Sequence, residues 1–215
     1  MSELIAVNVL LEPDEPALER AGALNATLRA DLGAGFAFDE THWPHVTVLQ
    51  RYLRSVDLDG ALAAIDGVVA ARDLGGLRLR AVDLEGAEFG TPAGTLLAGV
   101  AFEPEPALVV LQEALVVALA PFTRAGGTAG AFFTSPDEPG VNASTIAYVD
   151  EYVPAHAGEH YAPHMTVGIG AKERVRVLSG EFRRFALSPG AVAVYQLGDF
   201  GTARRALKTW PLGRA

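Results

Sequence analysis

The sequence predicts an α+β fold built from two lobes of similar construction that face each other across a cleft. Strand-like and helix-like segments alternate along the 215 residues. Their order of strand, helix, strand, helix and strand begins again near residue 91. Within each copy, one strand carries nearly the same letters, "WPHVTVLQ" at 43–50 and "APHMTVGI" at 162–169. These three observations together favour an internal duplication.

The first copy covers about residues 1–90 and opens with an apolar run, 4–11, that ends at Glu12-Pro13 and is typical of a strand. Leucine and alanine then recur at helical spacing, which predicts a helix over 15–32. The same periodicities predict a strand over 45–52, a helix over 57–72 and a strand over 77–84.

The second copy covers about residues 91–215 and opens in the same way, with a strand over 95–102 that ends at another Glu-Pro pair. It is longer because an insertion rich in glycine and proline occupies about 121–143. The elements expected after the first strand are a helix containing Leu108 to Leu119, strands over 144–153 and 164–169, a basic helix over 171–184, and a hairpin of strands 191–200 and 203–212.

Composition limits the possible classes of protein. Half of the residues are hydrophobic, so the chain can bury a core. No apolar run is long enough to span a bilayer, and residues 1–15 lack a basic leader, so we expect neither a membrane protein nor a signal peptide. Cysteine is absent, which excludes disulfides, thiolate metal sites and thiol nucleophiles. The lack of cysteine fits the reducing cytoplasm, where we expect the protein to act. We also expect it to be a monomer.

The formal net charge is −9, opposite in sign to that of proteins that coat long nucleic acids. The charge is uneven, since eight basic residues between 172 and 208 outnumber three acidic ones. These basic residues form either a solvated helix face with a charged hairpin or, for one or two arginines, a contact with an anionic ligand.

The repeated stretch places a histidine and a threonine two residues apart on each predicted strand. Side chains alternate along a strand, so His45 and Thr47 share one face, as do His164 and Thr166. The intervening valine and methionine side chains point into the core. If the lobes are related by a pseudo-twofold axis, both polar pairs meet in one cleft. A lone histidine on a strand is usually structural, and it is the repetition that favours function.

Two histidines on opposite sides of a phosphodiester can supply both proton transfers that its cleavage needs. One imidazole accepts a proton from the attacking group and the other protonates the leaving oxygen. Histidine suits both roles because its ordinary pKa lies near neutrality. The hydroxyls of Thr47 and Thr166 can donate to the phosphate oxygens. This chemistry requires no metal and no cofactor.

The two tetrads, His45-Val46-Thr47-Val48 and His164-Met165-Thr166-Val167, resemble the duplicated motif of the 2H phosphoesterase superfamily. This group includes bacterial 2′-5′ RNA ligase-like proteins and cyclic phosphodiesterases. The resemblance extends from "IAVNVLLEPDE" to "QLGDFGTARRALKTWPL". It implies a bilobal fold with antiparallel sheets lining a central cleft and helices outside. It also implies metal-independent chemistry on 2′,3′-cyclic or 2′-5′-linked nucleotide or RNA phosphodiesters.

The resemblance also implies roles for the two histidines. In hydrolytic members, the second histidine activates water and the first protonates the leaving 2′-oxygen, which would make His164 the base and His45 the acid. Ligation would reverse these roles. The expected partner is a small nucleotide or a short RNA end.

Two further residues are candidates for substrate binding. Continued alternation along the first histidine strand puts Leu49 and Arg51 on the cleft face, so Arg51 could contact phosphate. Its alternative is a surface salt bridge. A base could stack on Tyr161, which directly precedes the second motif. Core packing is the alternative for Tyr161, and Trp43, Phe132 and Phe133 are other candidates for stacking.

Two other functions compete with hydrolysis. A protein that binds an RNA end or a cyclic nucleotide, or a 2′-5′ RNA ligase, would show little hydrolytic turnover. A metal hydrolase could use His156, His160 and His164, which are spaced by four residues. Proline and glycine interrupt that segment, so we expect no metal site. We expect His42, His156 and His160 to lie in loops or at the rim of the cleft.

Overall fold

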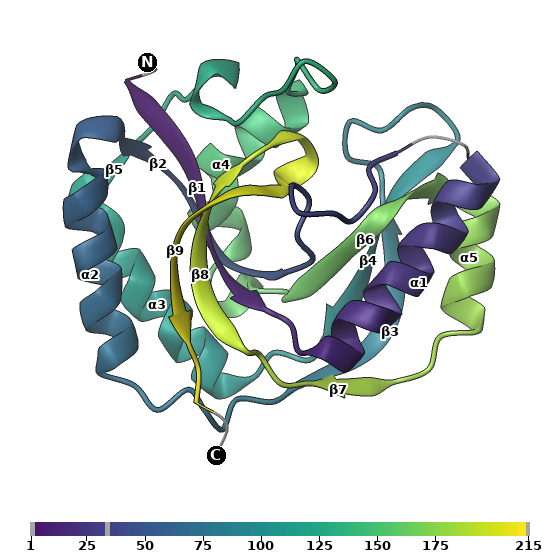
Figure 1. Cartoon of the computed structure of the whole chain (residues 1–215), viewed down its shortest axis with the longest axis horizontal. Coiled ribbons are helices and arrows are strands. Elements are labelled where there is room, and N and C mark those ends of the chain that lie inside the picture. Colours follow the sequence, from purple (N-terminus) through teal and green to yellow (C-terminus); the bar gives the residue numbers. More distant parts are fainter. Residues whose placement is uncertain (1–2, 33–34, 214–215) are drawn as a thin grey trace.

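The computed structural model describes residues 3–32 and 35–213, which form two antiparallel sheets flanked by helices (Figure 1). The first sheet has the strand order β5-β2-β1-β8-β9 and the second has the order β6-β4-β3-β7. The α+β class with antiparallel sheets is therefore confirmed. The strands of the first sheet are β5 (Thr123–Arg124), β2 (Val46–Arg54), β1 (Leu4–Glu12), β8 (Ala191–Leu197) and β9 (Ala203–Pro211). Those of the second are β6 (His164–Ala171), β4 (Thr95–Phe102), β3 (Leu79–Ala87) and β7 (Phe185–Leu187).

The helices divide between the two sheets (Figure 1). Helices α2 (Leu58–Ala70) and α3 (Pro106–Leu119) lie together beside the first sheet. Helices α1 (Glu15–Leu32) and α5 (Lys172–Gly180) lie beside the second. Helix α4 (Ala143–His156) contacts β2. Short 3-10 turns occupy Ser55–Asp57, Ala120–Phe122, Ala129–Ala131, Gly158–His160 and Asp199–Gly201.

The two halves of the sequence are interlocked in space. Helix α1 follows β1 in the chain but packs on β6 of the other sheet, and α3 follows β4 but packs on β2. Strand β3 leaves the first half to pair with β4, while β8 leaves the second half to pair with β1. Each sheet therefore takes strands from both halves, and the boundary near residue 91 is not a boundary between lobes.

The strand predicted over 144–153 is wrong, because this segment is helix α4. Its sequence, "STIAYVDEYV", is rich in β-branched and aromatic residues, which favour strands. Two local features select the helix. The Asn142 side chain accepts a hydrogen bond from the backbone N–H of Thr145 at 2.8 Å and caps the first turn. The buried residues Thr145, Val149 and Tyr152 recur at helical spacing.

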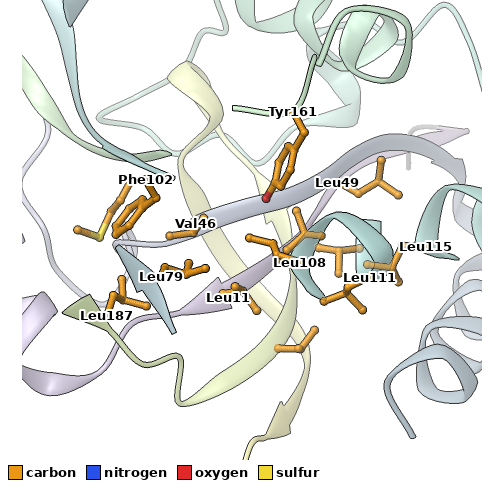
Figure 2. Close-up of a cluster of buried hydrophobic side chains, with 14 of the residues drawn as sticks. Leu11, Val46, Leu49, Leu79, Phe102, Leu108, Leu111, Leu115, Tyr161 and Leu187 are labelled. Atoms are coloured by element: carbon orange, nitrogen blue, oxygen red, sulfur yellow. The ribbon is translucent and has the colours of Figure 1, made fainter. Parts of the chain in front are cut away.

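A continuous hydrophobic core joins the two sheets (Figure 2). Leu11 and Val46 from the first sheet, Leu79 from the second and Leu108 from α3 are all buried in it. Each such side chain stabilises the fold by about 1.5–3 kcal/mol on burial. The core fixes the relative position of the sheets, and with it that of the histidine strands. No helix in the described part of the chain is long and apolar enough to cross a membrane.

Candidate active site

The two histidine tetrads meet in one cavity. His45, directly before β2, Thr47 of β2, and His164 and Thr166 of β6 all line a single cavity of about 510 Å³. This volume falls within the range of about 300–1,000 Å³ that is common for small-molecule sites. Val46 and Met165, which follow the two histidines, are fully buried. This agrees with the expected alternation of side chains between the cavity and the core.

Each of the two imidazoles makes an equivalent hydrogen bond to the backbone. The Nδ1 atom of His45 lies 2.8 Å from the carbonyl oxygen of Trp43, two residues earlier. The Nδ1 atom of His164 lies 3.0 Å from the carbonyl oxygen of Ala162, again two residues earlier. A carbonyl can only accept, so each Nδ1 carries the proton. Each Nε2 is therefore left to exchange protons.

The prolines that precede both histidines explain this shared geometry. Pro44 and Pro163 have a fixed φ angle and restrict the residue before them to extended conformations. The restricted residues are Trp43 and Ala162, whose carbonyls accept the imidazole hydrogen bonds. In each motif, the proline therefore helps to orient the carbonyl of the residue before it toward the imidazole of the histidine after it.

Both histidine strands also contain a β-bulge at the same position of the motif. Thr47 pairs with Leu10 and Leu49 pairs with Val9, so Val48 is the extra residue. Thr166 pairs with Gly99 and Gly168 pairs with Ala98, so Val167 is the extra residue in β6. A bulge bends the strand and reverses the alternation of side chains beyond it.

A buried amide side chain binds the carbonyl of each bulged valine. Gln112 of α3 donates from Nε2 to the Val48 carbonyl at 2.9 Å. Asn25 of α1 donates from Nδ2 to the Val167 carbonyl at 3.0 Å. Both amide side chains also form hydrogen bonds with the segments that precede the histidine strands. Gln112 Oε1 accepts from the N–H of Gly158 at 2.9 Å, and Asn25 Nδ2 also donates to the Phe36 carbonyl at 3.1 Å.

Thr47 has two further contacts. The Asn8 side chain donates from Nδ2 to Thr47 Oγ1 at 2.9 Å, and both side chains are buried. Because that bond occupies the hydroxyl as an acceptor, its proton is free to be donated elsewhere. The Tyr161 hydroxyl donates to the Thr47 carbonyl at 2.7 Å and so links the segment before β6 to β2 (Figure 2).

The two histidines differ in their surroundings. His164 is exposed to solvent, whereas His45 is half-buried at the base of its strand. Burial lowers the pKa of His45 to about 4, and the electrostatic effect of His164 acts in the same direction, while the hydrogen bond to Trp43 opposes both. His45 is therefore neutral near pH 7.

Arg51 does not line the cavity. The bulge at Val48 reverses the alternation, so Leu49 is buried in the core and Gln50 lines the cavity instead. The prediction for Arg51 assumed an unbroken strand. Tyr161 does line the cavity, but its ring is buried and its hydroxyl is engaged with β2, so it braces the site.

The basic residues between 172 and 208 do not line the cavity either. Lys172, Arg174 and Arg176 form ion pairs with Glu88, Asp31 and Glu173, respectively. Arg204 is buried and pairs with Glu138. The structure favours the interpretation of this segment as a charged surface.

The other histidines have separate environments. His42 lies in the loop before β2, as expected, and is buried there, where it contacts the carboxylates of Asp39 and Glu138 at 3.2 and 3.1 Å. His156 is the last residue of α4 and not a loop residue, and its ring is tilted against that of Tyr148, with 4.5 Å between the ring centroids. His160 is exposed. In residues 3–32 and 35–213, no three histidine, aspartate or glutamate side chains form a group that could hold a metal ion.

Sequence reasoning missed Asn8, Asn25, Gln50, Gln112 and Phe200. The first, second and fourth carried a recognisable signal, because each is a single neutral amide within an apolar strand or on an apolar helix face. Phe200 carried none. It lines the cavity with a backbone φ of 55°, a region that residues other than glycine rarely adopt.

Comparison with known proteins finds likeness at the level of solved structures. A phosphoesterase crystal structure is 15% identical, with 97% of this chain and 98% of that chain covered and a TM-score of 0.44. Usb1 of Kluyveromyces marxianus is 8% identical, with 98% and 99% covered and a TM-score of 0.45. The same Usb1 with uridine monophosphate is 10% identical, with 96% and 98% covered and a TM-score of 0.47. No protein-family model and no curated protein sequence matches the chain.

Proposed function

We propose that this chain is a metal-independent phosphoesterase of the 2H type, which cleaves 2′,3′-cyclic or 2′-5′-linked nucleotide phosphodiesters. The observation that carries the proposal is the pair of imidazoles from matched strands that line one cavity, each with its Nδ1 proton committed to a backbone carbonyl. Two imidazoles with free Nε2 atoms supply one proton acceptor and one proton donor.

The reaction needs one proton removed and one delivered. Water attacks phosphorus as the base takes its proton, and the bond from phosphorus to a ribose oxygen breaks as the acid protonates that oxygen. The Thr47 hydroxyl, which accepts from Asn8, is free to donate to a phosphate oxygen as charge develops there. Thr166 occupies the corresponding place on β6.

The surroundings of the histidines favour one assignment of roles. His45 has a depressed pKa and is neutral near pH 7, which suits the base. The acid is then His164, the other imidazole of the pair, which is exposed to solvent. This order is opposite to the one that the family resemblance implies for hydrolytic members.

Phosphorus NMR of 2′,3′-cyclic AMP hydrolysis, in the presence of a chelator, tests the proposal. We expect the wild type to give one regioisomer of the monophosphate, and His45→Ala and His164→Ala to lose at least about a thousandfold in rate. His160→Ala, which changes an exposed histidine outside the cavity, is the matched control and should retain full activity.

Equal activity in the two active-site variants and the wild type would overturn the two-histidine mechanism. If the wild type is inert, 2′-5′-linked oligonucleotides are the next substrates. Tight binding of these compounds without turnover would favour the alternative of a binding protein, and joining of RNA ends would favour a ligase.

A further inference from the structure

The cavity that holds the two histidines is lined by carboxylates and apolar side chains besides the repeated motif. Among the described residues, neither lysine nor arginine lines it, whereas Glu85 and Glu103 do. Glu103 is paired with Arg80, but Glu85 forms no ion pair within residues 3–32 and 35–213. The arginine closest to the motif in sequence, Arg51, points away because of the bulge at Val48.

The remainder of the wall is largely apolar and aromatic. Away from the histidines and threonines, the lining includes Val82, Phe89, Leu97, Phe102, Tyr148 and Phe200. Several of these are only partly buried by the protein, so they present apolar surface to a bound molecule. Covering such surface favours a ligand with an uncharged, flat or apolar group.

From this distribution we infer that the substrate carries one negative charge only, on the phosphodiester that reacts, and that the group attached to it is uncharged. This inference rests on the proposed function and names its substrate class, a nucleoside 2′,3′-cyclic monophosphate without further phosphates. A second phosphate would meet no lysine or arginine among the lining residues that the structure describes, and it would meet the Glu85 carboxylate. Longer nucleic acids, which bind by neutralising several phosphates, are disfavoured for the same reason.

The reacting phosphate itself does not need a basic side chain. A cyclic diester has a single charge, which the proton-donating imidazole of the proposed mechanism and the hydroxyls of Thr47 and Thr166 can balance. The carboxylate of Glu85 is an acceptor for uncharged N–H or O–H donors, such as those of a ribose or a base. The cavity thus offers groups for one anion together with groups for an uncharged substituent.

The test compares two substrates that differ by one phosphate. We would measure kcat/KM for adenosine 2′,3′-cyclic phosphate with a free 5′-hydroxyl and for the same compound with a 5′-phosphate. The expected preference for the 5′-hydroxyl compound is at least about tenfold. Glu85→Lys should reduce or reverse that preference, because it replaces the carboxylate in the wall with an ammonium.

Glu113→Lys is the matched control, since it makes the same change in net charge on the exposed face of α3, outside the cavity. It should leave the preference unchanged. Equal kcat/KM values for the two substrates in the wild type, or equal effects of the two lysine variants, would overturn this inference and leave the proposed function standing. Failure to hydrolyse either compound would instead count against both.

Discussion

Asn25 and Gln112 occupy matching places in the structure, one on α1 and the other on α3. Each donates its side-chain amide to the carbonyl of a bulged valine that lies three residues after one of the two cavity histidines. Each helix belongs to one half of the sequence and packs on the histidine strand of the other half. The two imidazoles are therefore positioned by interactions between the halves.

Replacement of either amide by an apolar side chain should impair catalysis without touching the cavity. Asn25→Leu and Gln112→Met each leave a buried carbonyl without its donor, at a cost of about 1–3 kcal/mol in the free energy of unfolding. The bulge should then relax, so we expect kcat to fall with little change in KM. Thr27→Ala on the same helix as Asn25 is the control, and equal kinetics for all three variants would contradict the positioning role.

Neutral His45 as the base predicts the pH dependence of kcat/KM. Because the pKa of His45 is lowered to about 4, activity should persist well below pH 6.5. It should decline only as the pH approaches about 4. If His45 were instead the acid, its proton would be lost as the pH rises through about 4, and activity would fall toward neutrality. A pH profile of kcat/KM with 2′,3′-cyclic AMP separates these outcomes.

The same pKa predicts a loss of stability in acid. The pKa of His45 is about 4 in the folded state and 6.5 when unperturbed, so the unfolded chain binds more protons between these values. Stability is full above pH 6.5 and decreases as the pH falls toward about 4. Urea unfolding of the wild type and His45→Gln should show a steeper decrease for the wild type. Parallel curves would show that burial of His45 does not depress its pKa.

Asn8 is expected to act through Thr47. Asn8→Leu removes the donor that occupies the Thr47 hydroxyl, which leaves the hydroxyl free to turn. We expect kcat to fall by about tenfold in Asn8→Leu and in Thr47→Val, and by little more in the double variant, because both changes remove one interaction. Kinetics of this double-mutant cycle provide the measurement. Additive losses would mean that Asn8 has a separate role.

Phe200 offers a test of the apolar wall. Its backbone lies in the left-handed region, where its N–H donates to Thr145 Oγ1 and Asp199 Oδ1 at 3.0 Å each. Asparagine tolerates this conformation better than most residues, so Phe200→Asn should fold with unchanged or greater stability. Loss of the ring should raise KM for 2′,3′-cyclic AMP several-fold with kcat nearly constant. An unchanged KM would show that the ring does not contact the substrate.

Most elements of the fold were predictable because their periodicity is strong. The apolar spacing of α1, α2 and α3 and the alternation in β3 gave their type and approximate bounds. Helix α4 was predicted to be a strand because its β-branched and aromatic residues favour strands, and the capping role of Asn142 was not recognised. Pairing across the halves could not be predicted, since it depends on contacts between residues distant in sequence.

The site was predictable where it depends on local geometry. Alternation on a strand places His45 with Thr47 and His164 with Thr166, and both pairs do line the cavity. The prediction for Arg51 failed because a single extra residue in the strand reverses every later side chain. Asn25 and Gln112 could not be linked to the bulges without the arrangement of α1 and α3 in space.

The interlocking of β3 and β8 has a consequence for how the site arises during synthesis. The central strand β1 is made first, yet its partner β8 is among the last strands to be made. Until β8 is made, one edge of β1 is unpaired, and until α3 of the second half is made, the carbonyl of Val48 lacks its Gln112 donor. A chain that ends before β8 would therefore keep an unpaired edge on its central strand. Truncation before β8 should abolish catalysis even though His45, Thr47, His164 and Thr166, the residues proposed to act on the phosphate, would still be present.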